Sequence, residues 1–348
     1  MMRPLLCRAA SIALFASLGM SGATAAQSDA ELLKQARDIF MPLPKDMSTA
    51  EAPATKERVE LGRMLFFDPR MTIDSSMSCA NCHQPAFYGT DALAKPTGVR
   101  QRPHPRNTPT VLDAGLSFVI HWRGDRTSLE DQVVQALVSP ITSGQPDEKA
   151  AADRIARIPG YAPLFKAAFP GESQPVTREN IGKAIGAYER TLVTPSPFDA
   201  YLKGNVNAMA PPARAGLARF MAVGCATCHN GVGVGGGMYQ KFGVVESYWE
   251  ATGSQPVDKG RADVTKDPAD EYVFRVASLR NVAKTPPYFH DGSVATLPEA
   301  VKVMGRVQLG ANLSDGEVDE IVMFLENLTG DLPPQFATAP ALPTAAAR

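Results

Sequence analysis

Cysteine is scarce in this chain of 348 residues: there are only five, and four of them lie in two short segments, 79–83 and 225–229. The fifth, Cys7, lies near the N-terminus. Charge of either sign is not in excess either, because 35 Lys and Arg face 36 Asp and Glu. This balance argues against nucleic-acid binding and against a polybasic membrane-binding patch. The apolar stretch 9–20 is short and interrupted by serine and glycine, which disfavours a transmembrane anchor.

The N-terminal segment has the features of a cleaved export signal. Arg3 and Arg8 precede the apolar stretch, and Ala23-Thr24-Ala25 forms an A-x-A cleavage site. We therefore expect residues 1–26 to be a signal peptide that takes Cys7 with it, and we expect the mature protein in the periplasm. Removal of two arginines and no acidic residue lowers the formal net charge from −1 to −3.

The remaining cysteines form two copies of a C-x-x-C-H pattern. The copies consist of Cys79, Cys82 and His83, and of Cys225, Cys228 and His229. This pattern is the attachment signature of c-type haem, in which both thiols bind the haem covalently and the adjacent imidazole can bind its iron. One copy could arise by chance or form half of a zinc site. Two copies that use every cysteine of the mature chain indicate two covalent haems, which are attached outside the bacterial cytoplasm.

Each motif occupies the same place in a repeated order of elements. Amphipathic helical stretches at 56–67 and 213–223 precede the motifs, and each half closes on a helix predicted to start at Thr177 or Ser314. We expect a mainly α fold with two c-type cytochrome-like domains, each around one covalent haem. The expected boundaries are 27–195 for the N-terminal domain, 196–334 for the C-terminal domain and 335–348 for a disordered tail rich in alanine and proline.

Six further segments carry a resemblance to a known family. They read LGRMLFFDPR at 61–70, RNTPTV at 106–111, SPFDAYLKG at 196–204, DKGR at 258–261, LRNVA at 279–283 and PYFHDG at 287–292. In this order they resemble the bacterial dihaem cytochrome c peroxidases over nearly all of the mature chain. The resemblance implies that the N-terminal haem, with His83 as its proximal ligand, reduces hydrogen peroxide. It also implies a C-terminal haem that stores electrons from a small cytochrome c or cupredoxin, in a protein that is commonly a homodimer.

The resemblance also assigns roles that the residues alone leave open. Met304 stands in the family's M-G-x-x-Q-L-G setting, which makes it the second iron ligand opposite His229, although most methionines are core residues. Trp122 matches a family tryptophan that lies between the haems and carries electrons, whereas a lone tryptophan is more often a core anchor. Gln132 matches a glutamine of the peroxide-binding pocket.

A calcium ion between the domains is a further implication of the resemblance. Its family ligands are one asparagine side chain and two backbone carbonyl groups, which correspond here to Asn107, Thr285 and Pro287. Oxygen ligands of this kind suit a hard cation.

The chain departs from the family at two positions near the N-terminal haem. Many members have a histidine that caps the iron where this chain has Val99, and His104 could replace it only if a loop flanked by prolines rearranged. The family's general acid/base glutamate is also missing from the segment 139–148. Asp147 and Glu148 could reach the site, but acidic residues at such a junction usually cap a helix.

The sequence therefore predicts a periplasmic dihaem cytochrome c peroxidase with an uncapped N-terminal haem. One alternative is a relative of the dihaem oxidases that mature methylamine dehydrogenase, which use a tyrosine opposite the second haem, so Met304 argues against it. The other alternative is a non-catalytic electron carrier or sensor that has lost its glutamate.

Overall fold

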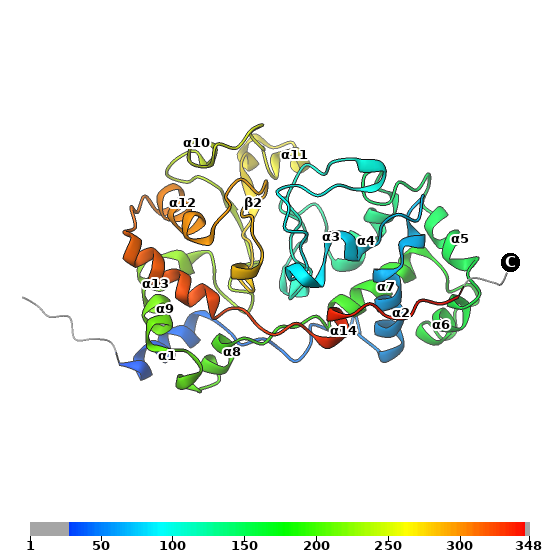
Figure 1. The fold of residues 1–348 in the computed structure, drawn as a ribbon, viewed down its shortest axis with the longest axis horizontal. Coiled ribbons are helices and arrows are strands. Elements are labelled where there is room, and N and C mark those ends of the chain that lie inside the picture. Colours follow the sequence, from blue (N-terminus) through cyan, green and yellow to red (C-terminus); the bar gives the residue numbers. More distant parts are fainter. Residues whose placement is uncertain (1–27, 345–348) are drawn as a thin grey trace, which may run out of the picture.

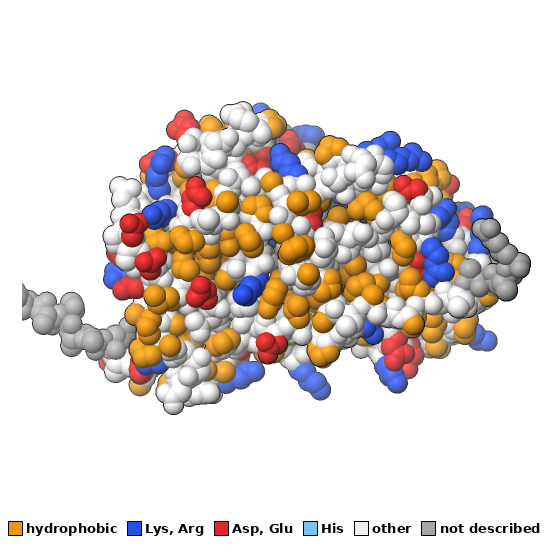
Figure 2. All heavy atoms as spheres, in the orientation of Figure 1, with side chains coloured by type: hydrophobic (Ala, Val, Ile, Leu, Met, Phe, Trp, Pro, Cys, Tyr) orange, Lys and Arg blue, Asp and Glu red, His pale blue; other side chains and the backbone are white. Residues whose placement is uncertain are grey.

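The computed structural model describes residues 28–344 and consists mainly of helices arranged as two lobes side by side (Figure 1). The predicted signal peptide lies outside the described residues. None of the described helices is both long and apolar enough to cross a membrane. Acidic, basic and apolar side chains are interspersed over the face drawn in Figure 2, in agreement with the balanced composition.

The N-terminal lobe follows the expected order of helices. It contains α2 (Lys56–Phe67), α3 (Cys79–Cys82), α4 (Leu129–Val138), α5 (Ala150–Ala156), α6 (Tyr161–Ala168) and α7 (Arg178–Glu189). Short 3₁₀ helices connect them at Pro69–Met71, Pro85–Phe87, Val99–Gln101 and Ala114–Leu116. The predicted helix 56–67 is confirmed, and Thr177 caps α7 by accepting a hydrogen bond from the backbone N–H of Asn180.

The C-terminal lobe repeats this plan with a small sheet added. Its helices are α8 (Pro197–Leu202), α9 (Pro211–Val223), α10 (Tyr248–Thr252), α11 (Ala262–Thr265), α12 (Leu297–Leu309) and α13 (Asp315–Glu326). Its 3₁₀ helices are Val206–Ala208, Cys225–Thr227, Pro268–Asp270 and Val282–Lys284. Strands β1 (Tyr239–Lys241) and β2 (Val273–Arg275) pair antiparallel, with Tyr239 opposite Arg275. The predicted capping box of Ser314 and Glu317 begins α13.

Each lobe is built on one closely crossed pair of helices. In the N-terminal lobe α2 crosses α7, and a Cβ atom at Gly62 would overlap the backbone carbonyl group of Ala184. In the C-terminal lobe α9 crosses α13, and a Cβ atom at Gly216 would overlap the carbonyl group of Glu320. The helix before each C-x-x-C-H motif thus meets the closing helix of its lobe at a glycine, which supports the predicted internal repeat.

The two ends of the chain pack into the lobe that is distant in sequence. Helix α1 (Asp29–Ile39) buries Leu32 and Ala36 in the core of the C-terminal lobe, while α14 (Pro334–Ala337) lies on the N-terminal lobe (Figure 1). The start of the expected disordered tail is ordered instead, because Phe336 is fully buried in the N-terminal core and Arg63 Nε donates to the carbonyl oxygen of Gln335 at 2.7 Å. The domain boundary near residue 195 stays a prediction.

Candidate haem sites

The first C-x-x-C-H motif lines a cavity of about 360 Å³ in the N-terminal lobe. Helix α3 spans the motif, so Cys79 and Cys82 lie one turn apart at the cavity wall. Nδ1 of His83 lies 3.0 Å from the carbonyl oxygen of Gly89, which can only accept, so Nδ1 carries the proton and Nε2 stays free for a metal. Burial lowers the pKa of His83 and thereby favours the neutral imidazole that iron requires.

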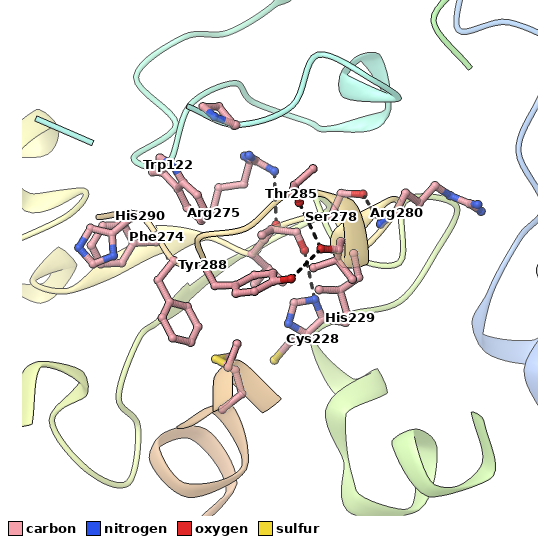
Figure 3. A pocket seen from close by; sticks show the side chains of 18 of the residues that line it. Trp122, Cys228, His229, Phe274, Arg275, Ser278, Arg280, Thr285, Tyr288 and His290 are labelled. Carbon is pink, nitrogen blue, oxygen red and sulfur yellow. Dashed lines mark hydrogen bonds between the residues drawn. The ribbon is translucent and has the colours of Figure 1, made fainter. Parts of the chain in front are cut away.

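The second motif lines a cavity of about 280 Å³ in the C-terminal lobe. Nδ1 of His229 lies 3.1 Å from the carbonyl oxygen of Ala277, and burial lowers the pKa of His229 to about 4. Figure 3 shows His229 and Cys228 together at one side of this cavity. Met304, from α12, lines the same cavity and is thus brought to the site that the sequence predicts for it. The two imidazoles are therefore held in the same way by two different backbone carbonyl groups.

The described cysteines are chemically suited to haem attachment. All four are free thiols, with no disulfide in either motif. Burial raises the pKa of Cys79 to about 12 and that of Cys82 and Cys225 to about 11. The free thiols at the two cavity walls are the groups that would add across the vinyl groups of a haem.

Buried arginines supply the charge that a haem would need. Arg275 lines the second cavity, is 8% exposed and forms no ion pair with any residue in 28–344. It donates to the carbonyl oxygen of His121 at 3.1 Å, and burial lowers its pKa to about 10. Its neighbour Arg280 is equally buried but pairs with Asp199 at 2.9 Å. Because an unpaired buried charge is costly, the carboxylate of a haem propionate fits the unpaired position beside Arg275.

The first cavity contains a similar unsatisfied donor. Arg126 lines it, and although Arg126 pairs with Asp125 through Nη1 at 3.1 Å, its buried Nε has no hydrogen-bond partner within 28–344. Each cavity therefore combines two thiols, one neutral imidazole and a guanidinium group that is not fully satisfied by described residues: Arg275 lacks a counter-charge, and Arg126 lacks an acceptor for its Nε. The residues of both cavities fit a covalently attached haem.

The two cavities share one wall, and Trp122 lies in it. The shared lining residues are Asn107, Thr108, Pro109, Thr110, Ala114, Ile120, His121 and Trp122. The indole Nε1 of Trp122 donates to the carbonyl oxygen of Asn107 at 3.0 Å, and the carbonyl oxygen of Trp122 accepts from the N–H of Arg275 at 2.8 Å. Trp122 is thus fixed by hydrogen bonds from both lobes, close to Arg275 (Figure 3).

The peroxide-binding side that the sequence predicts is only partly assembled around the first cavity. Gln132, from α4, and His104 both line it. Val99 is fully buried, and its side chain faces the Ile73 and Gly144 region, so it is absent from the cavity wall. Its backbone N–H donates to the carbonyl oxygen of Ile141 at 2.9 Å, which closes this loop against the segment that follows α4.

Asp147 and Glu148 do not reach the first cavity. Asp147 accepts hydrogen bonds of 2.9 Å from the backbone N–H groups of Lys149 and Ala150, just before α5. Glu148 pairs with Arg178 at 3.0 Å. Both carboxylates therefore have the structural roles that acidic residues at a loop-to-helix junction usually have.

A different carboxyl group, missed in the sequence, does line the first cavity. Glu189, in the last turn of α7, is 7% exposed, and its side-chain carboxyl group accepts no hydrogen bond from a described residue. Burial, and then the charge of Glu130, raise the pKa of Glu189 to about 8. The signal in the sequence was its position four residues after Ile185, on the apolar face of the predicted helix.

The three residues predicted to bind calcium all line the second cavity. They are Asn107, Thr285 and Pro287. The side-chain N–H₂ group of Asn107 donates to the carbonyl oxygen of Leu93 at 2.9 Å, so its Oδ1 faces elsewhere. Residues 28–344 contain no cluster of three or more His, Cys, Asp or Glu side chains that could hold a metal. A calcium site would depend on amide and backbone oxygens and stays a prediction.

Comparisons with known proteins agree with this geometry. A family model described as di-haem cytochrome c peroxidase matches residues 56–207. A cytochrome c551 peroxidase of Pseudomonas aeruginosa is 42% identical, over 91% of this chain and 92% of that protein. A cytochrome c551 peroxidase of Nitrosomonas europaea is 40% identical, over 82% and 83% of the two chains. The crystal structure of a MauG-like protein associated with microbial copper homeostasis superimposes with a TM-score of 0.74 at 28% identity, over 84% of this chain and 96% of that chain.

Proposed function

Because this chain belongs to the bacterial di-haem cytochrome c peroxidase family, we propose how its two cavities divide the reduction of hydrogen peroxide. The protein is an oxidoreductase of mainly helical fold with two c-type haems, and it acts on peroxide. When bound in the first cavity, a haem supplies an iron centre that can take up peroxide and exchange electrons with it. The proposal is supported above all by the shared wall with Trp122, and the division of roles by Met304, which lines only the second cavity, and Gln132, which lines only the first.

In the first cavity, the protein positions the iron and the peroxide. His83 would bind the iron through Nε2, because the Gly89 carbonyl group holds the proton on Nδ1. Gln132 can donate from its amide to a peroxide oxygen. Val99 points away, so no side chain at that position competes with peroxide for the iron. These placements support a site that is open without prior reduction.

Proton supply is the weaker part of this site. Reduction of one peroxide molecule to two waters consumes two protons, and the family's glutamate is missing. Glu189 is the carboxyl group that lines the cavity in protonated form near neutral pH. Water must deliver the protons when Glu189 is too distant from the peroxide, which would make turnover slower than in members with a nearby glutamate.

The second cavity serves as the electron store. His229 and Met304, which line the same cavity, would hold its iron, and this ligand pair would favour a high potential and electron transfer. Electrons pass through Trp122, whose ring lies in the common wall. Arg275, whose backbone N–H binds the Trp122 carbonyl group, would hold one haem propionate and neutralise its charge next to the tryptophan. The presence of Met304 in the cavity argues against the tyrosine-ligated oxidase.

The surroundings of the enzyme follow from its relatives and from its own N-terminus. A small c-type cytochrome or a cupredoxin donates the electrons, and the protein acts in the periplasm after loss of residues 1–26. Calcium bound by Asn107, Thr285 and Pro287 would brace the shared wall, since Asn107 also accepts the hydrogen bond of Trp122.

The test is steady-state oxidation of a reduced small cytochrome c by hydrogen peroxide. We expect turnover in the wild type and a large loss in Trp122→Phe, with haem content and the spectra of both haems unchanged. The matched control is Trp249→Phe, which replaces the other tryptophan and should leave donor-driven turnover intact. Negligible turnover in the wild type, with both haems reducible, would instead identify an electron carrier.

A further inference from the structure

Both tryptophans of the protein belong to one continuous row of packed rings. Trp122 meets His290 with ring centroids 6.4 Å apart, and His290 meets Tyr248 at 5.2 Å. Tyr248 meets Trp249 at 5.2 Å, and Trp249 meets Tyr272 at 4.7 Å. We call these five side chains the aromatic row. The two tryptophans of the protein, its only ones, thus occupy two positions of the same row.

The aromatic row leads from the wall between the cavities to the surface. Trp122 lies in that wall, and Figure 3 shows it above His290. His290 is 2% exposed and Tyr248 is fully buried. Trp249 and Tyr272 are both partly exposed to solvent. The row therefore has one end next to both haem sites, a buried middle and an end that solvent can reach.

Phenylalanine rings insulate the middle of the row. Phe242 stacks on Tyr248 at 4.7 Å with an interplanar angle of 8°, and Phe274 stacks on His290 at 4.4 Å. Benzene rings are much harder to oxidise than indole or phenol rings. An electron vacancy in this region would therefore remain on the tryptophans and tyrosines.

Hydrogen bonds distinguish the buried tyrosine from the exposed one. The Tyr248 hydroxyl donates to the carbonyl oxygen of Asp258 at 3.1 Å and accepts from its N–H at 2.9 Å. Burial raises the pKa of Tyr248 to about 12, and its hydroxyl donates to a backbone carbonyl group, which cannot take up the proton. Tyr272 is partly exposed and can release its proton to water. Oxidation of Tyr272 can therefore give a lasting radical, whereas oxidation of Tyr248 can only be transient.

We propose that the aromatic row carries oxidising equivalents from Trp122 to Trp249 and Tyr272 when peroxide arrives faster than the electron donor. This inference rests on the peroxidase function proposed above. One peroxide molecule takes up two electrons and two protons to give two waters. When the second haem supplies only one electron, the other leaves Tyr272, and its phenolic proton passes to solvent. A small phenolic reductant then returns one hydrogen atom to the Tyr272 radical, so this exposed end is a second site of reductant oxidation.

The experiment exposes holoprotein whose second haem is reduced and whose first haem is oxidised to one equivalent of peroxide without donor. Freeze-quench EPR on protein with ring-deuterated tyrosine or tryptophan identifies the radical, and peptide mass spectrometry locates lasting oxidation. We expect radical and oxidation at Trp249 and Tyr272 in the wild type, with a several-fold loss of both in Tyr248→Phe. The matched control is Tyr201→Phe, which removes the hydroxyl of a buried tyrosine in the same lobe that lies outside the row. Donor-driven turnover should be unchanged in both variants.

The outcomes separate this inference from the proposed function. Equal oxidation at Trp249 and Tyr272 in the wild type and in Tyr248→Phe would overturn the row as the route. Normal donor-driven turnover with no oxidation at either residue would also overturn it, while leaving the peroxidase function intact. Absence of peroxide turnover even with donor would refute the proposed function and this inference together.

Discussion

The wild-type protein should become less stable as the pH rises, because the buried Glu189 then ionises. Replacing Glu189 by glutamine should remove this loss of stability. Glu189 is buried in the first cavity wall with a folded-state pKa of about 8, against an ordinary value of 4.5. The folded state thus keeps its proton over a range in which the unfolded chain has released it. Stability is therefore fully present below pH 4.5 and is lost as the pH rises towards and through the folded-state pKa.

The size of this effect follows from the two pKa values. The full difference corresponds to about 5 kcal/mol, of which about 4 kcal/mol would be lost by pH 8. Glutamine has nearly the shape of the protonated carboxyl group but cannot ionise. The stability of Glu189→Gln relative to the wild type should therefore be near zero at pH 4.5 and should rise to several kcal/mol at pH 8.

The assay is urea denaturation of the holoprotein followed by far-UV circular dichroism at a series of pH values. Glu179→Gln is the control, because it makes the same change on the same helix at a carboxylate whose side chain is 56% exposed. Its stability difference from the wild type should be small at every pH. A Glu189→Gln difference that is independent of pH would refute the reasoning, since it would mean that Glu189 ionises alike in the folded and unfolded states.

Three other predictions test the architecture and the iron ligands. Gly216→Ala should lower the free energy of unfolding by several kcal/mol and lower the melting temperature, because the added methyl group meets the α13 backbone. Gly316→Ala, on the open side of α13, should be neutral or slightly stabilising. Equal melting temperatures of the two variants would contradict the close crossing of α9 and α13. Met304→Ala should lower the potential of one haem in a redox titration and leave the other unchanged, and an unaltered pair of potentials would exclude Met304 as a ligand. His104→Ala should leave one high-spin and one low-spin haem in the EPR spectrum of the oxidised protein, and conversion of a low-spin signal would instead show that His104 caps the first iron.

Features encoded by neighbouring residues were predictable from the sequence. The C-x-x-C-H motifs specify their own local geometry, and the helices before and after them show their apolar period and caps directly. Met304 and Trp122, which line the cavities, could be singled out only through the resemblance to a family, because nothing within a few residues of either points to a haem.

Features that depend on the meeting of distant segments were not predictable. Gly62 and Gly216 read as ordinary helical glycines until the partner helix is in place. Arg275 reads as a strand residue, and its lack of a counter-charge is visible only when the folded surroundings are known. Phe336 is one aromatic residue in a stretch of alanine and proline, so no periodic pattern marks it as a core residue. It belongs to the same core as Phe66 of α2, which lies 270 residues earlier in the chain.

The exchange of chain ends between the lobes has a consequence for how the protein can mature. The core of the N-terminal lobe is complete only when Phe336 arrives, and the core of the C-terminal lobe includes α1 from the beginning of the chain. A protein cut between residues 195 and 196 would therefore leave two fragments that each lack a piece of their own interior. In chain order, the first haem motif precedes Phe336 by more than 250 residues. Haem could thus be attached at Cys79 and Cys82 while the lobe is still open, before Phe336 completes its core.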